Sequence, residues 1–198
     1  MAESFSDYMQ AFLREKNPTD VLEVGSDMQL RLALKLAPYC QNFYSVNFPD
    51  EHRQMEGWLG MHKVMGGVDN IRFLSGNAVQ LSGLISHADV IIVHNVLLDL
   101  NGEDTTLMWK YRRGELECSE EQWQELVSRF RSAGERGYKE FLKVANPGYI
   151  VRFGRPAEDQ EFRTLAEKLG VEPSRIETRE LLYDGLDKTW MAHIMDNS

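Results

Sequence analysis

The sequence predicts an α/β fold: a doubly wound, mainly parallel seven-stranded sheet with helices on both faces and a C-terminal antiparallel hairpin. Short apolar, β-branched runs alternate with amphipathic helical stretches, as expected of parallel strands joined by crossover helices. The last two strand-like runs, 175–182 and 189–195, are separated by the turn-rich YDGLDK, so they should pair antiparallel. The 198 residues suit one well-cored domain and are few for two, so we expect a single domain over 1–198.

The first half of the chain should begin with an N-terminal helix (1–17), helical from Glu3 to Lys16. One face of it is apolar, and Asn17-Pro18 ends it. Short apolar runs predict strands at 21–24, 42–46, 71–74 and, most clearly, 88–94. A helix over 50–65 should end at Gly66-Gly67 and bury the inward-facing residues Met55, Trp58, Leu59 and Met65.

The second half contains a capping-box pattern, Ser119 to Gln122, which predicts the start of a long helix. The inner stripe of this helix is expected to be Trp123, Leu126, Val127 and Phe130, and a bend or break is expected at Gly134 and Gly137. A turn at 146–148 should lead into a fifth parallel strand, 149–153. A helix over 157–169 should follow and stop at Gly170.

The composition narrows the class of protein. An excess of acidic residues gives a formal net charge of −9, which argues against a nucleic-acid-binding surface. Cys40 and Cys118 form no metal or redox spacing, as in the reduced thiols of an intracellular protein. No signal-peptide pattern is present, and no apolar run reaches the ~20 residues needed to cross a bilayer. We expect a cytoplasmic protein without membrane or nucleic-acid partners; its oligomeric state is not predicted.

Five landmarks, in order from about Asp20 to Met195, resemble the class I S-adenosylmethionine-dependent methyltransferases. VLEVGSD resembles the family's acidic-x-Gly-x-Gly-x-Gly turn after the first strand, and YSVNFPDEHRQM resembles the second strand with its terminal acid. NIRFLSGNAVQL is similar to the third strand and its Gly-Asp-Ala turn. ADVIIVHNVLLDL and LKVANPGYIVRFG resemble the fourth strand and the turn into the fifth.

The resemblance implies an S-adenosylmethionine pocket at the carboxyl ends of the strands. Glu23 and Gly25 match the first motif, whereas Asp27 and Gln29 replace its second and third glycines. Asp27 either meets the ammonium or sulfonium group of the cofactor or caps the next helix. The implied cofactor-binding residues are Glu23, Gly25, Ser26, Asp27, Asn47, Phe48, Asn77, Ala78 and Asn95.

Two amides stand where the family carries acids. Asn47 takes the place of the residue that accepts hydrogen bonds from the ribose hydroxyls, and Asn77 that of the residue beside the adenine. An amide can accept one hydrogen bond and donate another, but it lacks the strength that a carboxylate charge adds. The resemblance therefore implies an altered pocket that keeps its hydrogen-bonding groups.

His94 ends the fourth strand and is the candidate general base, because imidazole titrates near neutral pH. The alternative is a histidine that is hydrogen-bonded at a strand end. Segment 99–118 mixes aromatic and basic residues, so it is either a lid over the acceptor or an irregular connection that packs on the body. No histidine has a partner at metal-ligand spacing, and no metal site is expected.

The resulting hypothesis is a methyltransferase that acts on a small-molecule acceptor, or on a protein. Methyl transfer needs mainly alignment of the acceptor with an already activated methyl group. Two alternatives remain: a non-catalytic binding or assembly module, and an enzyme of another class with a different ligand in the same crevice. A dinucleotide site is disfavoured because the GxGxxG spacing is missing, and the absence of GxxxxGK[ST] excludes a P-loop hydrolase.

Overall fold

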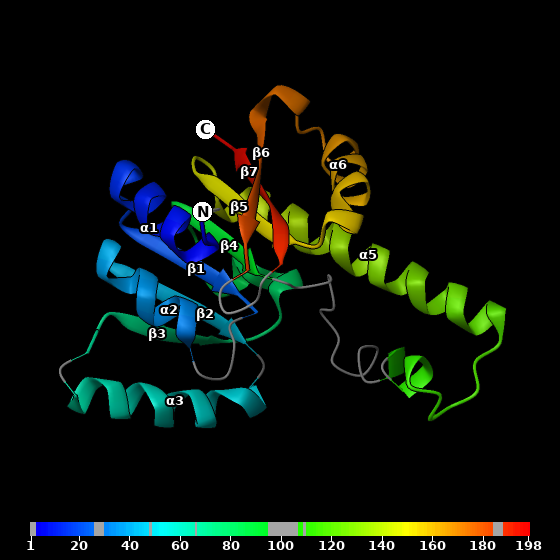
Figure 1. The fold of residues 1–198 in the computed structure, drawn as a ribbon, viewed down its shortest axis with the longest axis horizontal. Helices are drawn as coiled ribbons and strands as arrows, with labels where there is room; N and C mark the ends of the chain where they lie inside the picture. The colour runs from blue at the N-terminus through cyan, green and yellow to red at the C-terminus, as the bar shows by residue number, and fades with distance from the viewer. Residues whose placement is uncertain are drawn as a thin grey trace.

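The computed structural model describes residues 3–25, 30–47, 49–65, 67–94, 107–108, 110–183 and 188–198, with backbone only for 49–53 and 94. A seven-stranded sheet of order β3-β2-β1-β4-β5-β7-β6 runs through the molecule (Figure 1). β1 to β5 are parallel, and β7 pairs antiparallel with both β5 and β6. The predicted fold class is confirmed.

The strands lie close to their predicted positions. Apolar side chains cover both faces of the central strands, as in parallel sheets buried under helices; Val21 to Val24 of β1 are all buried. The bounds are β1 (Asp20–Val24), β2 (Asn42–Asn47), β3 (Ile71–Ser75), β4 (Val90–His94), β5 (Tyr149–Gly154), β6 (Ile176–Leu182) and β7 (Thr189–Asp196).

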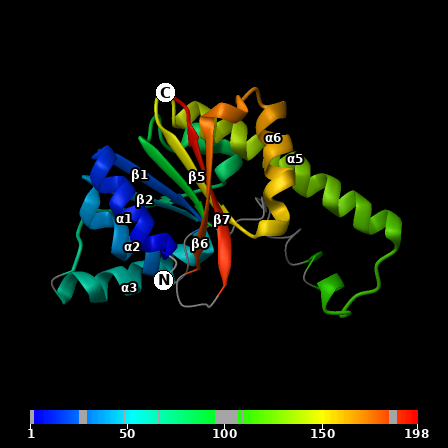
Figure 2. The same cartoon turned by 45° about the horizontal axis from the view of Figure 1, so that its top comes forward.

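Helices cover both faces of the sheet (Figures 1 and 2). The first face packs against α1 (Phe5–Lys16), α2 (Arg31–Leu36) and α3 (Pro49–Val64). The second packs against the 3-10 segment η2 (Ala78–Gly83), α5 (Glu120–Val144) and α6 (Asp159–Lys168). α1 begins two residues later than predicted because the Ser4 hydroxyl accepts the N–H of Asp7 (3.1 Å) and caps the helix.

α3 corrects part of the predicted core. Met55 and Leu59 are buried as expected, but Trp58 and Met65 are 40% and 79% exposed. Met55 and Leu59 are four residues apart and therefore share the helix face that meets the sheet. Trp58 lies at the edge of that face and Met65 follows the last residue of α3, so both are exposed and the prediction that they are buried was wrong.

α5 begins at the predicted capping box: Ser119 Oγ accepts the N–H of Gln122, and Gln122 Oε1 accepts the N–H of Ser119. The helix continues unbroken through Gly134 and Gly137, contrary to the expected bend, and both glycines are buried. Its 25 residues span about 37 Å, and its N-terminal half extends past the sheet (Figure 1). Of the predicted inner stripe only Leu126 is fully buried; Trp123, Val127 and Phe130 are half-buried.

Candidate functional site

The candidate site lies at the carboxyl ends of β1, β2 and β3, next to β4. The strand order changes direction between β1 and β4, because β2 and β3 follow on one side of β1 and β4 and β5 on the other. The register brings Val24 beside Val46 on one side and Val93 on the other. Ligands of open α/β sheets bind in the crevice at this kind of switch point.

Gly25 is the first residue after β1 and has a φ of +83°, a conformation that L side chains rarely adopt. Its N–H donates to the carbonyl of Val46 (3.5 Å), which ties the start of the turn to β2. The glycine predicted from the first motif is therefore required by the backbone at this point. Ser26 and Asp27, also predicted for this turn, lie outside the described residues.

Glu23, Ser45 and Asn47 form a row of buried polar residues, here called the β1–β2 cluster. Their side chains are 1%, 0% and 7% exposed, and Glu23 is in register with Ser45 on the neighbouring strand. Alternation along the strands places all three on the face covered by α1 to α3. Ser45 was not predicted as a site residue, although a hydroxyl within the apolar NFYSV run was a usable signal.

Asn47 is held in a fixed orientation. Its Nδ2 donates to Ser45 Oγ (3.1 Å) and lies 3.3 Å from Met55 Sδ on α3. The backbone carbonyl of Asn47 accepts the N–H of Gly76 (3.1 Å), so the turn after β3 is joined to the end of β2. These contacts bring the segment before Asn77 next to Asn47, as the resemblance implied.

Asn77 caps η2. Its Oδ1 accepts the N–H of Val79 (3.1 Å), and Ala78, the first residue of η2, is 5% exposed. The oxygen expected beside an adenine amine is thus already bonded to the backbone, although a carbonyl oxygen has a second lone pair.

The remaining predicted residues are placed only in part. The backbone of His94 ends β4 in register with Phe153, and the structure does not describe its side chain. Phe48 and Asn95 also lie outside the described residues. The structure therefore brings together Glu23, Gly25, Asn47, Asn77 and Ala78, and leaves the roles of the others as predictions.

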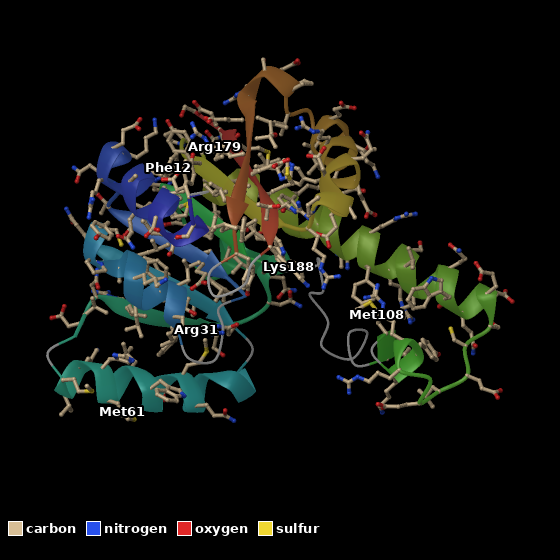
Figure 3. The ribbon with its side chains drawn as sticks, viewed as in Figure 1. Phe12, Arg31, Met61, Met108, Arg179 and Lys188 are labelled. Carbon is tan, nitrogen blue, oxygen red and sulfur yellow. The ribbon has the colours of Figure 1, made fainter. Side chains whose placement is uncertain are left out.

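The predicted lid, 99–118, is described at 107–108 and 110–118. Met108 is buried and lines a cavity of about 220 Å³ together with apolar residues of α5 (Figure 3). The Arg112 guanidinium lies 5.9 Å from the centre of the Trp123 ring. This part of the segment packs on the projecting half of α5 and contributes Arg112 to the cavity lining, to which α6 adds Glu161; the residues from α5 are Trp123, Leu126, Val127, Phe130 and Arg131.

A second group of polar side chains, the β5–β7 cluster, was not predicted; two of its members, Arg152 and His193, are buried and the other two are half-buried. It consists of Arg152, Glu158, Asp159 and His193. Arg152 Nη2 donates to Glu158 Oε2 (2.5 Å), and its Nη1 lies 3.5 Å from His193 Nδ1. His193 Nε2 is 2.5 Å from Asp159 Oδ1. The cluster lies between β5, β7 and the start of α6.

Burial lowers the pKa of the fully enclosed His193, although its contact with Asp159 opposes this. The hydrogen bond with His193 and the nearby Arg163 lower the pKa of the Asp159 carboxyl. A neutral imidazole that donates from Nε2 to the Asp159 carboxylate and turns Nδ1 toward Arg152 satisfies all of these contacts.

Within the described part of the chain, no group of three or more histidine, cysteine, aspartate and glutamate side chains is arranged to hold a metal ion. A search of the same residues finds no helix that is long and apolar enough to span a membrane.

No family model and no curated protein matches the sequence. The structure is similar to solved methyltransferases. N-methyltransferase NodS from Bradyrhizobium japonicum, in complex with S-adenosyl-L-homocysteine, matches with a TM-score of 0.58 and 14% identity over 98% of this chain and 89% of that one. Magnesium protoporphyrin IX methyltransferase ChlM from Synechocystis, with bound S-adenosylmethionine, matches with a TM-score of 0.60 and 13% identity over 96% and 77%.

An rRNA methylase from Streptococcus thermophilus matches with a TM-score of 0.55 and 11% identity over 99% of this chain and 98% of that one. The strand order and these matches agree over almost the full length of the chain. Likeness at such low identity concerns the fold, since one fold supports many functions. The chain has the fold of the class I S-adenosylmethionine-dependent methyltransferases.

Proposed function

We propose that this protein binds S-adenosylmethionine at the carboxyl ends of β1 to β3 and transfers its methyl group to a small-molecule acceptor. The observation that carries the proposal is the positive φ of Gly25, two residues after the buried Glu23 and next to the end of β2 that carries Asn47. Two of the similar structures hold this cofactor or its demethylated product.

The described residues fit such a ligand. Gly25 has no side chain to block a ligand that approaches the turn. The Nδ2 of Asn47 is bonded to Ser45, so its Oδ1 is the atom suited to accept from a ribose hydroxyl. Asn77 and Ala78 follow β3, where they would border the adenine. The cofactor supplies the activated methyl group, and the protein contributes alignment of the acceptor.

The net charge of −9 favours a small molecule over a nucleic acid as acceptor; a protein acceptor is the other option. His94, at the end of β4, is the proposed base for an acceptor that must lose a proton. Both cysteines are free thiols, which supports a cytoplasmic location.

Thermal unfolding with S-adenosylhomocysteine tests the proposal. At about 100 times its Kd the ligand should add about 2.7 kcal/mol, or roughly 5–10 °C in Tm for a domain of this size. Gly25→Val should remove this shift. Gly170→Val is the matched control, because Gly170 also has a positive φ (+80°) but lies after α6. It should lower Tm and keep the shift.

A non-catalytic binding or assembly module is the second candidate. It is favoured by the capping role of Asn77 and by the amides at both positions where the family carries acids. Absence of any Tm shift at millimolar S-adenosylhomocysteine would contradict the methyltransferase proposal and support this one. A shift that Gly25→Val leaves unchanged would place the ligand elsewhere.

A further inference from the structure

The outer side of α3 is unusually apolar. Among the described residues, five large hydrophobic side chains are exposed, and four of them belong to the second half of this helix or to the residue after it. They are Trp58 (40%), Met61 (58%), Val64 (90%) and Met65 (79%); the fifth is Leu116. Single exposed apolar residues are common, but a group on one helix marks an interaction surface.

The exposed residues form an ordered stripe. Gly57, Gly60, Met61 and Val64 have the spacing i, i+3, i+4, i+7 and share the helix face opposite Met55 and Leu59. We call these four the α3 stripe. A Cβ added at Gly57 or Gly60 would meet nothing within 4 Å, so both are open gaps. Figure 3 shows Met61 on the side of α3 turned away from the sheet.

The stripe therefore contains two protruding side chains and two gaps of its own. A surface that carries both is complementary to a copy of itself. When two such helices cross in opposite directions about a two-fold axis near Gly60, Val64 of one copy meets the gap at Gly57 of the other, and Met61 packs against Met61 of the other copy beside the two Gly60 residues. This is the isologous arrangement of most homodimers.

The charges beside the stripe favour an antiparallel arrangement of the two helices. Glu56 and Lys63 are both exposed, carry opposite charges and are seven residues apart, so they flank the stripe on the same side. Among the described residues, neither makes an ion pair. In an antiparallel pair, the side of one helix that carries Glu56 and Lys63 faces the same side of the other helix, which runs in the opposite direction. Glu56 of each copy then lies next to Lys63 of the other. In a two-fold parallel pair, the two copies of this side lie on opposite edges of the interface, so these charges would not pair across it.

We propose that the α3 stripe is the contact surface of a homodimer in which two α3 helices pack antiparallel. A helix of 16 residues is about 24 Å long and about 10 Å wide. The buried area is then at the low end for protein interfaces, which corresponds to a reversible dimer rather than an obligate one. Burial of Met61 and Val64 supplies the main driving force.

Sedimentation velocity of the full chain, from low-micromolar to submillimolar concentration, tests the dimer. The wild type should shift from monomer to dimer with a micromolar Kd. Met61→Glu and Val64→Glu should each weaken dimerisation about 100-fold or more. Leu116→Glu introduces the same charge at an exposed apolar residue away from α3 and should leave the Kd unchanged. A wild type that stays monomeric, or equal effects of all three variants, would overturn the proposal.

Charge reversal tests the orientation. Glu56→Lys and Lys63→Glu should each weaken the dimer about tenfold, because each sets two like-charge pairs across the axis. The double variant should return to within about threefold of wild type. Additive losses in the double variant would exclude the antiparallel pair. Circular dichroism should show the same helix content in every variant, since all the substituted side chains are exposed.

Discussion

The two polar clusters differ in burial and in how their charges are paired: all of the β1–β2 cluster is buried, whereas the acids of the β5–β7 cluster are half-buried. In the β5–β7 cluster the charges are paired: the Arg152 guanidinium with Glu158, and His193 with Asp159. The β1–β2 cluster places Glu23 in register with Ser45, whose hydroxyl accepts from the Asn47 amide, near the strand ends before the turn at Gly25. The first resembles a structural tie between β5, β7 and α6, whereas the second lies where ligands of this fold bind. Buried polarity alone therefore does not identify a site; its position in the sheet does.

The largest effect is expected from Arg152→Met. The change leaves the largely buried carboxylate of Glu158 without its guanidinium, and breaking a buried pair in this way costs about 3–5 kcal/mol. Urea denaturation should show this loss, while the affinity for S-adenosylhomocysteine stays the same. Arg131→Met, which removes an exposed ion pair with Glu161, is the control and should cost less than about 1 kcal/mol. Comparable losses in the two variants would mean that the β5–β7 cluster is not a structural tie.

In contrast to Arg152→Met, Glu23→Gln should change the affinity for the ligand. The replacement keeps the shape of the side chain and removes its charge, so affinity for S-adenosylhomocysteine should fall about 10- to 100-fold, or about 1.4–2.8 kcal/mol. Isothermal titration calorimetry measures the change. Glu158→Gln is the matched control in the other cluster and should lower stability with no change in affinity. An unchanged affinity in Glu23→Gln would remove Glu23 from the ligand site.

The pH dependence of stability should depend on His193. Burial lowers its folded-state pKa below the ordinary value of about 6.5, so the unfolded chain takes up a proton first as the pH falls. The free energy of unfolding should therefore decrease from about pH 7 toward pH 5, by at most about 1.4 kcal/mol per pH unit. The lowered pKa of Asp159 affects stability only at more acidic pH.

His193→Phe should flatten the plot of unfolding free energy against pH over this range, measured by urea denaturation at a series of pH values. His62→Phe, which removes a half-buried histidine from α3, serves as the control and should keep the wild-type slope. A slope that survives in His193→Phe would show that another group titrates.

The smallest effect is expected from Tyr138→Phe. The hydroxyl of Tyr138 is buried beside the β5–β7 cluster and has no hydrogen-bond partner among the described residues, and burial raises its pKa. Its ring packs edge-on against Phe141 with centroids 5.1 Å apart, a contact that phenylalanine keeps. The variant should be neutral or more stable by up to about 1 kcal/mol in urea denaturation. Tyr39→Phe, which loses hydrogen bonds to Gln10 and Arg14, should be slightly destabilised. A clear loss of stability in Tyr138→Phe would point to a hidden partner for its hydroxyl.

Features set by local chemistry could be predicted from the sequence. The β-branched run that became β4, the capping box at Ser119 and the stop at Gly170 all depend on neighbouring residues, and the structure has each of them. Gly25 could be predicted as well, because the fold requires it directly after the first strand.

Features set by contacts between distant parts of the chain could not be predicted from the sequence. α3 is apolar on more than one side, so only its packing on the sheet decides that Leu59 is buried and Trp58 exposed. Gly134 and Gly137 appeared to be helix breakers, yet α5 packs closely against η2 and buries both. Arg152 and His193 are 41 residues apart and meet only through the register of β5 and β7.

The position of β7 has a consequence for how the chain is made. β7 is synthesised after β6, yet it lies between β5 and β6 and, in the part of the chain that the structure describes, is the one strand of the sheet that pairs with β6. A growing chain can assemble the parallel half of the sheet as it leaves the ribosome, since domains begin to fold from the N-terminus during synthesis. Most of the backbone groups of β6 stay without a partner strand until β7 is made; one exception is the N–H of Leu182, which donates to the carbonyl of Glu3. Premature termination before Thr189 would therefore release a product that has lost two strands of the sheet rather than one.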